Sequence, residues 1–589
     1  MTFEAWIVAL VVVVILIGLW KEIASPSLLV FGGVVFLLSV GIISTTEAFS
    51  GFSNPAPITV AALFVVARAV SKTGALDPIT KYLLGSSGDT RRPMLRMLAP
   101  TVTISGFVNN IPLVAMLVPQ VSAWAKRRGV DSSTFLMPLS YGAILGGMLT
   151  VIGTSTNLVV SGQMIESGLE PLSFFETGLV GLPIALLGVV VTTMIAPKVL
   201  GARKSARSDF EEGFRDYTIE MVVSSNGPAD GATVEGAGLR QLEGVFLASV
   251  DRGEESIAPA TPSTTLRGGD TLRFVGQIEN ILDLQRLPGI SFAEQGHVDQ
   301  LDHPSVHYFT VVIGADSDLV GHTLKEFGFR RKYQSAVIAI HRAGQRLEAK
   351  LGEVDIRVGD SLVIIADPGF ADRWRNRSDF LLVAPMDESI APVAPGAGIT
   401  LLTLGAMIVL AAIGAVPILL AALVAAIFLV AVGVLTPDEA RRGVDLEVIG
   451  LIASAFGLAA AVASSGLADA IADGMVGLLG GFGQYGILLG VILVTLALTE
   501  LVTNNATALL MLPIAIAAAP MSGVDPRGMA VAVAIGASAS FLTPIGYQTN
   551  TMVYGPGGYK FSDYMRLGAP LTIITIIVLM VLIPVVYPA

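Results

Sequence analysis

The chain has 589 residues, of which 53% are hydrophobic and 14% charged, and its formal net charge is −11. A soluble globular protein is far less apolar, so the composition indicates a polytopic membrane protein. Cysteine is absent, which excludes disulfides and thiolate metal sites. The five histidines have no zinc-type spacing, and the acidic charge argues against a nucleic-acid partner.

Ten apolar runs have the length expected of membrane-spanning helices. The first lacks the basic start and small-residue cleavage site of a signal peptide, so it is predicted to be a helix. In chain order the ten predicted spans are 6–20, 27–43, 57–71, 134–164 (interrupted), 173–197, 397–413, 415–435, 446–465, 528–555 (interrupted) and 569–587.

Two further apolar stretches, 98–123 and 487–519, each carry an Asn-Asn pair near the middle and a proline shortly after it. Backbone freed at such a break needs partners, so each stretch is predicted to be a re-entrant helical hairpin. The sequence thus predicts one membrane repeat in residues 1–200 and a second in 395–589, each with about five spans and one hairpin.

The two halves carry matching polar motifs. Asn109-Asn110 is followed by Gly153–Asn157, and Asn504-Asn505 is followed by Gly546–Asn550. Asn110 lies 47 residues before Asn157, and Asn505 lies 45 before Asn550. Two copies at similar spacing indicate a duplicated fold, with polar residues lining a protein-enclosed site. The sequence does not decide the alignment of the two copies to better than one residue, so Asn110 corresponds to either Asn504 or Asn505.

These motifs have the chemistry to bind an anion and a cation together. A helix that restarts after a break in the membrane presents free N–H groups and the positive end of its dipole, which favour an anion. Amide and hydroxyl groups both donate and accept hydrogen bonds. Unwound backbone near Gly153 or Gly546 offers the oxygen ligands that sodium prefers.

The charged residues of the loops predict the orientation. Lys and Arg cluster near 91–96, 126–128, 198–204 and 441–442, whereas the loops near 44–56, 165–172 and 466–486 contain none. By the positive-inside rule the basic side is cytoplasmic, and only Arg527 breaks the pattern. Both termini then face out and the two hairpins enter from opposite sides, which makes the repeats inverted.

Residues 201–392 are too polar to lie in the membrane and are predicted to be cytoplasmic. Their apolar residues fall in short β-type runs: 244–250, 271–275, 309–313, 335–340 and 361–365. Gly269-Asp270 and Gly359-Asp360 each precede a final strand. The repetition predicts two small α/β domains, 215–292 and 303–385, joined near 295–303, with a short helix near Leu239 or Leu324 in each.

The membrane halves resemble the divalent anion–sodium symporter family of the ion transporter superfamily, whose hairpin and downstream motifs pair across an inverted repeat. The insert resembles paired TrkA-C (RCK-C) domains. The resemblance implies a homodimer in the cell (inner or plasma) membrane, an elevator mechanism, Na⁺ as coupling ion with no other cofactor, and a small-molecule or nucleotide regulator of the soluble domains.

Carried onto this sequence, the resemblance assigns two sets of residues that overlap at the hairpins. The substrate set is Asn109, Asn110, Thr154, Ser155, Thr156, Asn504, Asn505, Thr507, Gln548 and Thr549. The sodium set is Asn110, Gly153, Asn157, Asn505, Gly546 and Asn550.

We therefore expect a secondary active transporter, with Na⁺-coupled symport of a divalent oxyanion, sulfate above others, as the first hypothesis. A di- or tricarboxylate symporter and an oxyanion efflux permease are alternatives. A ligand-gated channel or sensor is an alternative of a different class, although no carbonyl-filter sequence such as TVGYG is present. An enzyme is not expected, because no nucleophile–base pair or phosphate loop is evident.

Overall fold

A computed structural model of the chain divides into two compact units. The helical unit comprises Met1–Gly201, Ile390–Val553 and Lys560–Ala589, and the β unit comprises Ala202–Ser389 and Tyr554–Tyr559. The structure describes residues 2–21, 23–75, 90–128, 130–200, 218–239, 245–253, 255–257, 260–276, 289–292, 307–314, 317–342, 345–347, 351–367, 369–374, 377, 379–385, 396–479 and 484–589.

The first half of the helical unit has a helix, or a pair of helices, at each place where a span is predicted. Its helices are α1 (Phe3–Trp20), α2 (Pro26–Ser39), α3 (Thr45–Ala48), α4 (Ser50–Ser53), α5 (Pro55–Thr73), α7 (Arg91–Ser105), α8 (Asn110–Arg128), α9 (Ser133–Gly147), α10 (Ser155–Glu166) and α11 (Gly178–Val199). The predicted hairpin corresponds to α7 and α8, and the predicted interrupted span to α9 and α10.

The second half follows the same plan. Its helices are α17 (Ala397–Ala412), α18 (Ile418–Ala431), α19 (Pro437–Gly443), α20 (Leu446–Ser464), α21 (Leu467–Leu479), α22 (Gln484–Thr499), α23 (Asn504–Ser522), α24 (Pro526–Ser538), α25 (Gln548–Tyr554) and α26 (Phe561–Val586). The expectation of a loop at 466–486 is wrong for most of its length, because α21 occupies it. In α21 the polar residues Asp469 and Asp473 are four positions apart and alternate with apolar residues at helical spacing, so the segment forms a helix.

Five of the described helices, α5, α11, α20, α23 and α26, are long and apolar enough to cross a membrane. Shorter apolar helices accompany them. Together they fit a polytopic membrane protein. Large apolar side chains such as Val424 and Ile427 of α18 and Ile577 of α26 remain exposed, as residues that face lipid do.

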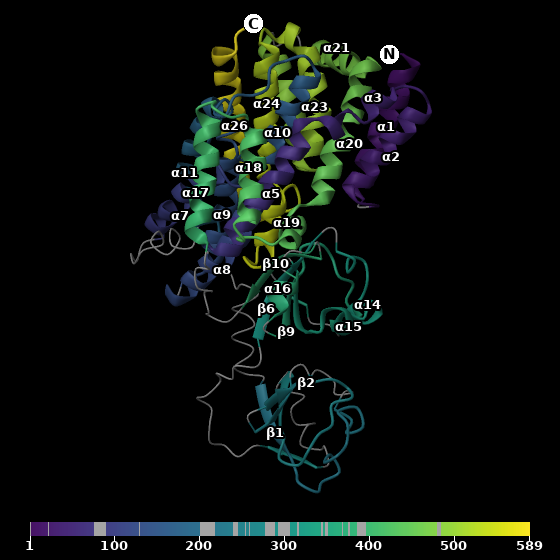
Figure 1. Cartoon of the computed structure of the whole chain (residues 1–589), viewed down its shortest axis with the longest axis vertical. Coiled ribbons are helices and arrows are strands. Elements are labelled where there is room, and N and C mark those ends of the chain that lie inside the picture. The colour runs from purple at the N-terminus through teal and green to yellow at the C-terminus, as the bar shows by residue number, and fades with distance from the viewer. Residues whose placement is uncertain are drawn as a thin grey trace. The chain divides into compact units, whose positions relative to one another are not determined.

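The helices that carry the polar motifs are enclosed by other helices. Every residue of α9 is buried, and so are most residues of α23 and α24. Figure 1 shows α10, α23 and α24 beside one another, and α10 packs against both of the others. At Gly146 of α9 a Cβ atom would lie 2.3 Å from the carbonyl oxygen of Val102 in α7. Close backbone approach of this kind is typical of helix packing in membranes.

The β unit contains two five-stranded antiparallel sheets of identical topology. The first has the order β3-β2-β4-β1-β5 and the second β8-β7-β9-β6-β10, which match strand for strand. The strands are β1 (Thr218–Val223), β2 (Val245–Arg252), β3 (Glu255–Ile257), β4 (Thr271–Gly276), β5 (Ile290–Phe292), β6 (His307–Ile313), β7 (Ala336–Arg342), β8 (Gln345–Arg346), β9 (Ser361–Ala366) and β10 (Phe380–Pro385). The five β-type runs of the sequence lie in β2, β4, β6, β7 and β9.

The helix expected near Leu239 is not present in the described residues, where 234–239 form turns. Its expected counterpart, Leu324, begins α14 (Leu324–Phe327), which α15 (Phe329–Tyr333) follows; α16 (Phe370–Trp374) and the 3₁₀ helix η2 (Leu351–Glu353) complete the second module. Glycine at positive φ recurs ninety residues apart, at Gly269 and Gly359. The same spacing matches Leu324 to Val234 rather than to Leu239. The predicted joint at 295–303 lies outside the described residues.

An ion pair between a partly exposed Arg and a buried Asp recurs in both modules. Arg252 contacts Asp270 and the carbonyl of Thr265, while Arg342 contacts Asp360 and the carbonyl of Asp355. Each Asp side chain is 1% exposed. The pair fixes the Gly-Asp turn against the end of β2 or β7. In the second module burial and a hydrogen bond to Asp379 raise the pKa of Tyr333.

We predict that Asp360→Ala lowers the free energy of local unfolding of the second sheet by about 3 kcal/mol, because it leaves the Arg342 guanidinium without its partner. Hydrogen–deuterium exchange of β7 and β9 in the full chain measures this. Asp318→Ala is the control, since the Asp318 carboxylate is 74% exposed in its pair with Lys332 and should cost less than about 1 kcal/mol. Equal exchange in the two variants would contradict the prediction.

Candidate functional site

Both interrupted helices are held open by an asparagine amide. Between α9 and α10 the chain leaves the helix, and the Asn157 Nδ2 atom donates to the carbonyl oxygens of Gly147 at 3.0 Å and Thr150 at 2.9 Å. Between α24 and α25 the Asn550 Nδ2 atom donates to those of Ser540 at 3.0 Å and Thr543 at 3.1 Å. Both side chains are 0% exposed. Carbonyls released by the break thus find a partner within the protein.

The first hairpin turn, residues 106–109, joins α7 to α8 and places Asn110 at the start of α8. Both ends of the Asn110 amide are satisfied when its nitrogen donates to the carbonyl oxygen of Gly153 at 3.2 Å and to Ser105 Oγ at 2.6 Å. Ser105 Oγ then donates to the carbonyl of Ala143 at 2.8 Å. The hairpin tip is therefore fixed to the first broken helix.

The second hairpin turn repeats this arrangement. Thr499 Oγ1 donates to Asn504 Oδ1 at 2.9 Å and lies 2.5 Å from the carbonyl oxygen of Ala537. Ser105 precedes Asn110 by five residues, and Thr499 precedes Asn504 by five. The structural counterpart of Asn110 is therefore Asn504, at the first position of α23. This settles the alignment that the sequence left open and replaces the pairing of Asn110 with Asn505.

Each hairpin tip also contacts the broken helix of the other half. The Tyr547 hydroxyl lies 3.0 Å from the Asn110 amide. Ser155 and Thr156, at the start of α10, donate to Asn505 Oδ1 at 3.1 and 3.2 Å. Amides and hydroxyls of both repeats thereby form one buried polar centre.

A third contact between the halves comes from α9. Ser140 Oγ lies 2.8 Å from Thr549 Oγ1 and 2.7 Å from Asn550 Oδ1. The corresponding oxygen of the first half, Asn157 Oδ1, is buried and has no hydrogen-bond partner among the described residues. The two Asn side chains are equivalent in their donor contacts and differ in their acceptor oxygens.

The remaining predicted residues lie around this centre. Asn109 Oδ1 accepts from the Ile111 amide, and Thr507 Oγ1 is buried without a hydrogen-bond partner in the described part of the chain. Gly153 and Gly546 lie in the two unwound segments. Gln548 begins α25 and, like Thr507, forms no side-chain hydrogen bond to another predicted site residue within the described part of the chain.

Ser105, Ser140, Thr499 and Tyr547 were missed by the sequence analysis although they orient the predicted residues. The hydroxyls five residues before Asn110 and Asn504 carry a weak signal, since both are small polar residues near the end of an apolar helix. Ser140 and Tyr547 act across the two halves, and no spacing within one half reveals them.

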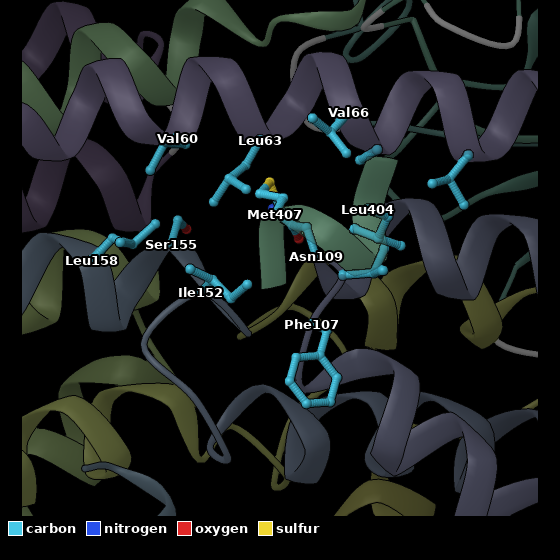
Figure 2. Close-up of a pocket in the computed structure, with 13 residues that line it drawn as sticks. Val60, Leu63, Val66, Phe107, Asn109, Ile152, Ser155, Leu158, Leu404 and Met407 are labelled. Carbon is cyan, nitrogen blue, oxygen red and sulfur yellow. The ribbon is translucent and has the colours of Figure 1, made fainter. Parts of the chain in front are cut away.

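A cavity of about 20 Å³ lies beside the first hairpin tip, which is room for about one water molecule. Figure 2 shows Asn109 and Ser155 at this cavity, with Val60, Leu63 and Val66 of α5 and Leu404 and Met407 of α17 around it. One wall thus offers an amide and a hydroxyl, and the opposite wall is apolar. None of the described residues that line it is Lys or Arg, so an anion bound there would interact with neutral dipoles.

No group of three or more His, Asp or Glu side chains that could hold a metal ion is found in the described part of the chain. The oxygen-rich segments at Gly147–Gly153 and Ser540–Gly546 are the places where a cation could find ligands. Asn157 Oδ1 fits such a role, because a buried acceptor without a donor is costly unless an ion or water occupies the position.

The fold and this buried polar centre define a polytopic membrane permease. The citrate transporter family model matches residues 6–536, and the model of the sodium:sulfate symporter transmembrane region matches 487–587. The chain therefore belongs to this family of ion-transporter-type permeases, which includes the divalent anion–sodium symporters.

Three relatives illustrate the similarity. The "Putative sulfur deprivation response regulator" of Chlamydomonas reinhardtii is 33% identical over 95% of this chain and 97% of its own length. An uncharacterized transporter of Synechocystis sp. is 32% identical over 96% and 94%. Sodium/sulfate cotransporter 1 of Chlamydomonas reinhardtii is 24% identical over 91% of this chain and 84% of its own length.

We predict that Asn110→Ala and Asn504→Ala each reduce transport at least about tenfold. Asn110 binds the carbonyl of Gly153 in the first break, and Asn504 binds the Thr499 hydroxyl that lies against Ala537 of α24, so each variant loosens a hairpin tip. Initial rates of uptake into proteoliposomes, normalised to folded protein, measure the effect. Tyr485→Ala is the control, since Tyr485 lies at the far end of α22 from the turn and is exposed. Near wild-type rates for both Asn variants would show that the tips do not form the site.

Proposed function

We propose that the protein is a secondary active transporter that moves sulfate together with Na⁺. The observation that carries this proposal is the buried centre in which amides and hydroxyls of both halves meet with no Lys or Arg among them. A divalent anion at such a centre needs a second source of positive charge, and a co-bound cation supplies it. The names of the sodium/sulfate cotransporter relatives and the sodium:sulfate symporter match support the same ion pair.

The sodium sites are proposed to lie at the two breaks. Asn110, Gly153 and Asn157 would form one, and the second would combine Asn505, Gly546 and Asn550 with the hairpin tip that starts at Asn504. Each offers carbonyl and amide oxygens, the ligand type that Na⁺ prefers. Sulfate would bind between the hairpin tips, near Asn109, Ser155, Thr156, Asn505 and Thr549, and Thr154, Thr507 and Gln548 complete the proposed substrate residues.

A citrate-type tricarboxylate is the second candidate substrate, because the family model that matches most of the chain is described as a citrate transporter. The apolar wall of α5 and α17 beside Asn109 and Ser155 suits carbon atoms as well as it suits a small oxyanion. Competition between labelled sulfate and unlabelled citrate or succinate separates the two candidates.

We further propose that the two halves are inverted repeats and that the β unit is cytoplasmic. The crossed contacts of the hairpin tips support a two-fold relation between the halves. Arg527, the exception to the charge rule, forms an ion pair with Glu176 and donates to the carbonyls of Glu170 and Pro171. A paired Arg at a helix start need not follow the loop-charge rule, so its position is compatible with the proposed orientation.

The decisive experiment is uptake of radiolabelled sulfate by proteoliposomes under an inward Na⁺ gradient, with K⁺ or a pH gradient in its place as controls. Sulfate accumulation that requires Na⁺ supports the proposal. Accumulation driven by a pH gradient alone would replace Na⁺ coupling by H⁺ coupling, and citrate uptake without sulfate uptake would change the substrate.

Thr156→Ala and Thr549→Ala should each weaken the apparent affinities for Na⁺ and for sulfate together, by about threefold to tenfold. Their hydroxyls lie at the first turns of α10 and α25, where both ligands would bind, and linkage requires that loss of one weakens the other. Titrating Na⁺ at fixed sulfate and sulfate at fixed Na⁺ tests this. A change in only one affinity would contradict the shared site.

The β unit is proposed to regulate or dimerise the transporter through its paired modules, which resemble TrkA-C domains. A ligand there can act only through its different affinity for the states of the transport cycle. Replacing residues 208–390 by a flexible linker should leave sulfate binding intact while altering the transport rate or the oligomeric state. Loss of sulfate binding in a folded deletion variant would place the substrate site elsewhere.

A further inference from the structure

The second break is one residue shorter than the first. In the first half the carbonyl of Ala143 accepts a hydrogen bond from the Ser105 hydroxyl, and the carbonyl of Gly147 accepts one from the Asn157 amide. Ala143 and Gly147 are four residues apart. The counterparts are Ala537, whose carbonyl oxygen lies against Thr499 Oγ1, and Ser540, whose carbonyl oxygen accepts from the Asn550 amide; they are three residues apart. The missing residue falls where α24 ends, at the C-terminal turn of the helix.

Two backbone N–H groups have different acceptors in the shorter break. In the first half the N–H groups of Met148 and Leu149 donate to the carbonyls of Leu145 and Gly146, within the last turn of α9. In the second half the matching N–H groups of Phe541 and Leu542 both donate to Glu500 Oε1 at 2.8 Å. The side chain of Glu500, in the turn between α22 and α23, thus accepts the two hydrogen bonds that helix carbonyls accept in the first half.

Glu500 binds the unwound segment with both carboxylate oxygens. Its Oε2 atom accepts from Thr543 Oγ1 at 2.8 Å and from Ser540 Oγ at 3.3 Å. The residue is 7% exposed, and these four donors are neutral N–H and O–H groups. An acceptor-only set of contacts fits the ionised carboxylate, whose charge these partners do not cancel.

The first half has glycine at the matching position. In the first half Thr150 Oγ1 donates to the carbonyl of Gly106. The corresponding contact in the second half is that of Thr543 Oγ1 with the carbonyl of Glu500, so Gly106 and Glu500 occupy matching positions. A Cβ atom on Gly106 would lie 3.3 Å from the carbonyl oxygen of Thr103, so the first half has little room for a side chain there. The carboxylate therefore belongs to the second break alone.

Glu500 also lies against a proposed sodium ligand. A Cβ atom at Gly546 would stand 2.9 Å from Glu500 Oε2, and the Gly546 N–H donates to Thr543 Oγ1, which Glu500 holds. The carboxylate thus shapes the segment that would present oxygens to the second cation. In the first half the unpartnered Asn157 Oδ1 is the available oxygen instead.

We propose that Glu500 is a positioning residue for the second cation site: it replaces the missing turn of α24, fixes residues 540–546 and adds a negative charge that the first site lacks. The two cation sites then differ chemically, because only the second has a carboxylate, that of Glu500, next to the residues that would bind the cation. This inference rests on the proposed Na⁺ coupling and goes beyond it by distinguishing the two sites.

The test compares Glu500→Gln with Glu447→Gln in the full-length protein. Glu447 at the start of α20 accepts from the N–H and hydroxyl of Ser27, so its carboxylate has similar partners but lies outside the polar centre. Two measurements are made: the shift of the unfolding temperature by NaCl against choline chloride without sulfate, and the half-saturating Na⁺ and sulfate concentrations for uptake.

Glu500→Gln should raise the half-saturating Na⁺ concentration at least about tenfold and shrink the Na⁺-induced rise in unfolding temperature, because charge-assisted contacts are lost. The sulfate KM measured at saturating Na⁺ should change less than about threefold. Glu500→Asp, which keeps the charge, should restore part of the Na⁺ affinity. Glu447→Gln should leave both affinities unchanged.

An unchanged Na⁺ dependence in Glu500→Gln overturns the inference, as does an equal loss of Na⁺ and sulfate affinity or a result matched by Glu447→Gln. If Glu500→Gln does not fold, Glu500→Asp is judged by the same Na⁺ criterion against the control. If the wild-type protein neither transports sulfate with Na⁺ nor is stabilised by Na⁺, the proposed function itself is wrong. The wild-type measurements show this before any variant is compared.

Discussion

Unpaired backbone groups inside an apolar helical unit are the constraint on which the rest of the structure depends. A helix that breaks where water is excluded releases N–H and C=O groups, each of which costs free energy unless it is satisfied. Asn157 and Asn550 satisfy the carbonyls of the two breaks, and both side chains are fully buried. The segments between can then stay unwound and present oxygens and N–H groups to ligands.

The same constraint explains why the halves interlock. Once each broken helix is held open, its ends present hydroxyls such as those of Thr156 and Tyr547, and each of these meets an asparagine of the opposite hairpin. Both halves therefore contribute to the buried polar centre. A shift of one half against the other would disturb both hairpin tips together, which suits a transporter whose ligands must be bound and released as a set.

The two breaks are not equivalent. The second is one residue shorter and its N–H groups donate to Glu500, whereas the first has a helical turn and a glycine in the corresponding places. In the β unit the copies are more alike: the strand order and the Arg–Asp pair are the same in both sheets. Substitution of either member of the Arg–Asp pair would leave the other charge without a partner, so the pair tolerates little change.

The sequence by itself determined the long apolar helices, the two motif-bearing hairpins, the interrupted helices and five of the ten described β-strands. These follow from hydrophobic periodicity and from polar residues that stand out in apolar runs. The sequence missed α21, whose acidic residues resemble a loop, and it could not align Asn110 with Asn504. Only the tertiary structure decided that alignment, the contacts of Ser140 and Tyr547, and the role of Glu500. These depend on which atoms meet across segments up to 437 residues apart, and spacing along one chain carries no information on distances of that kind.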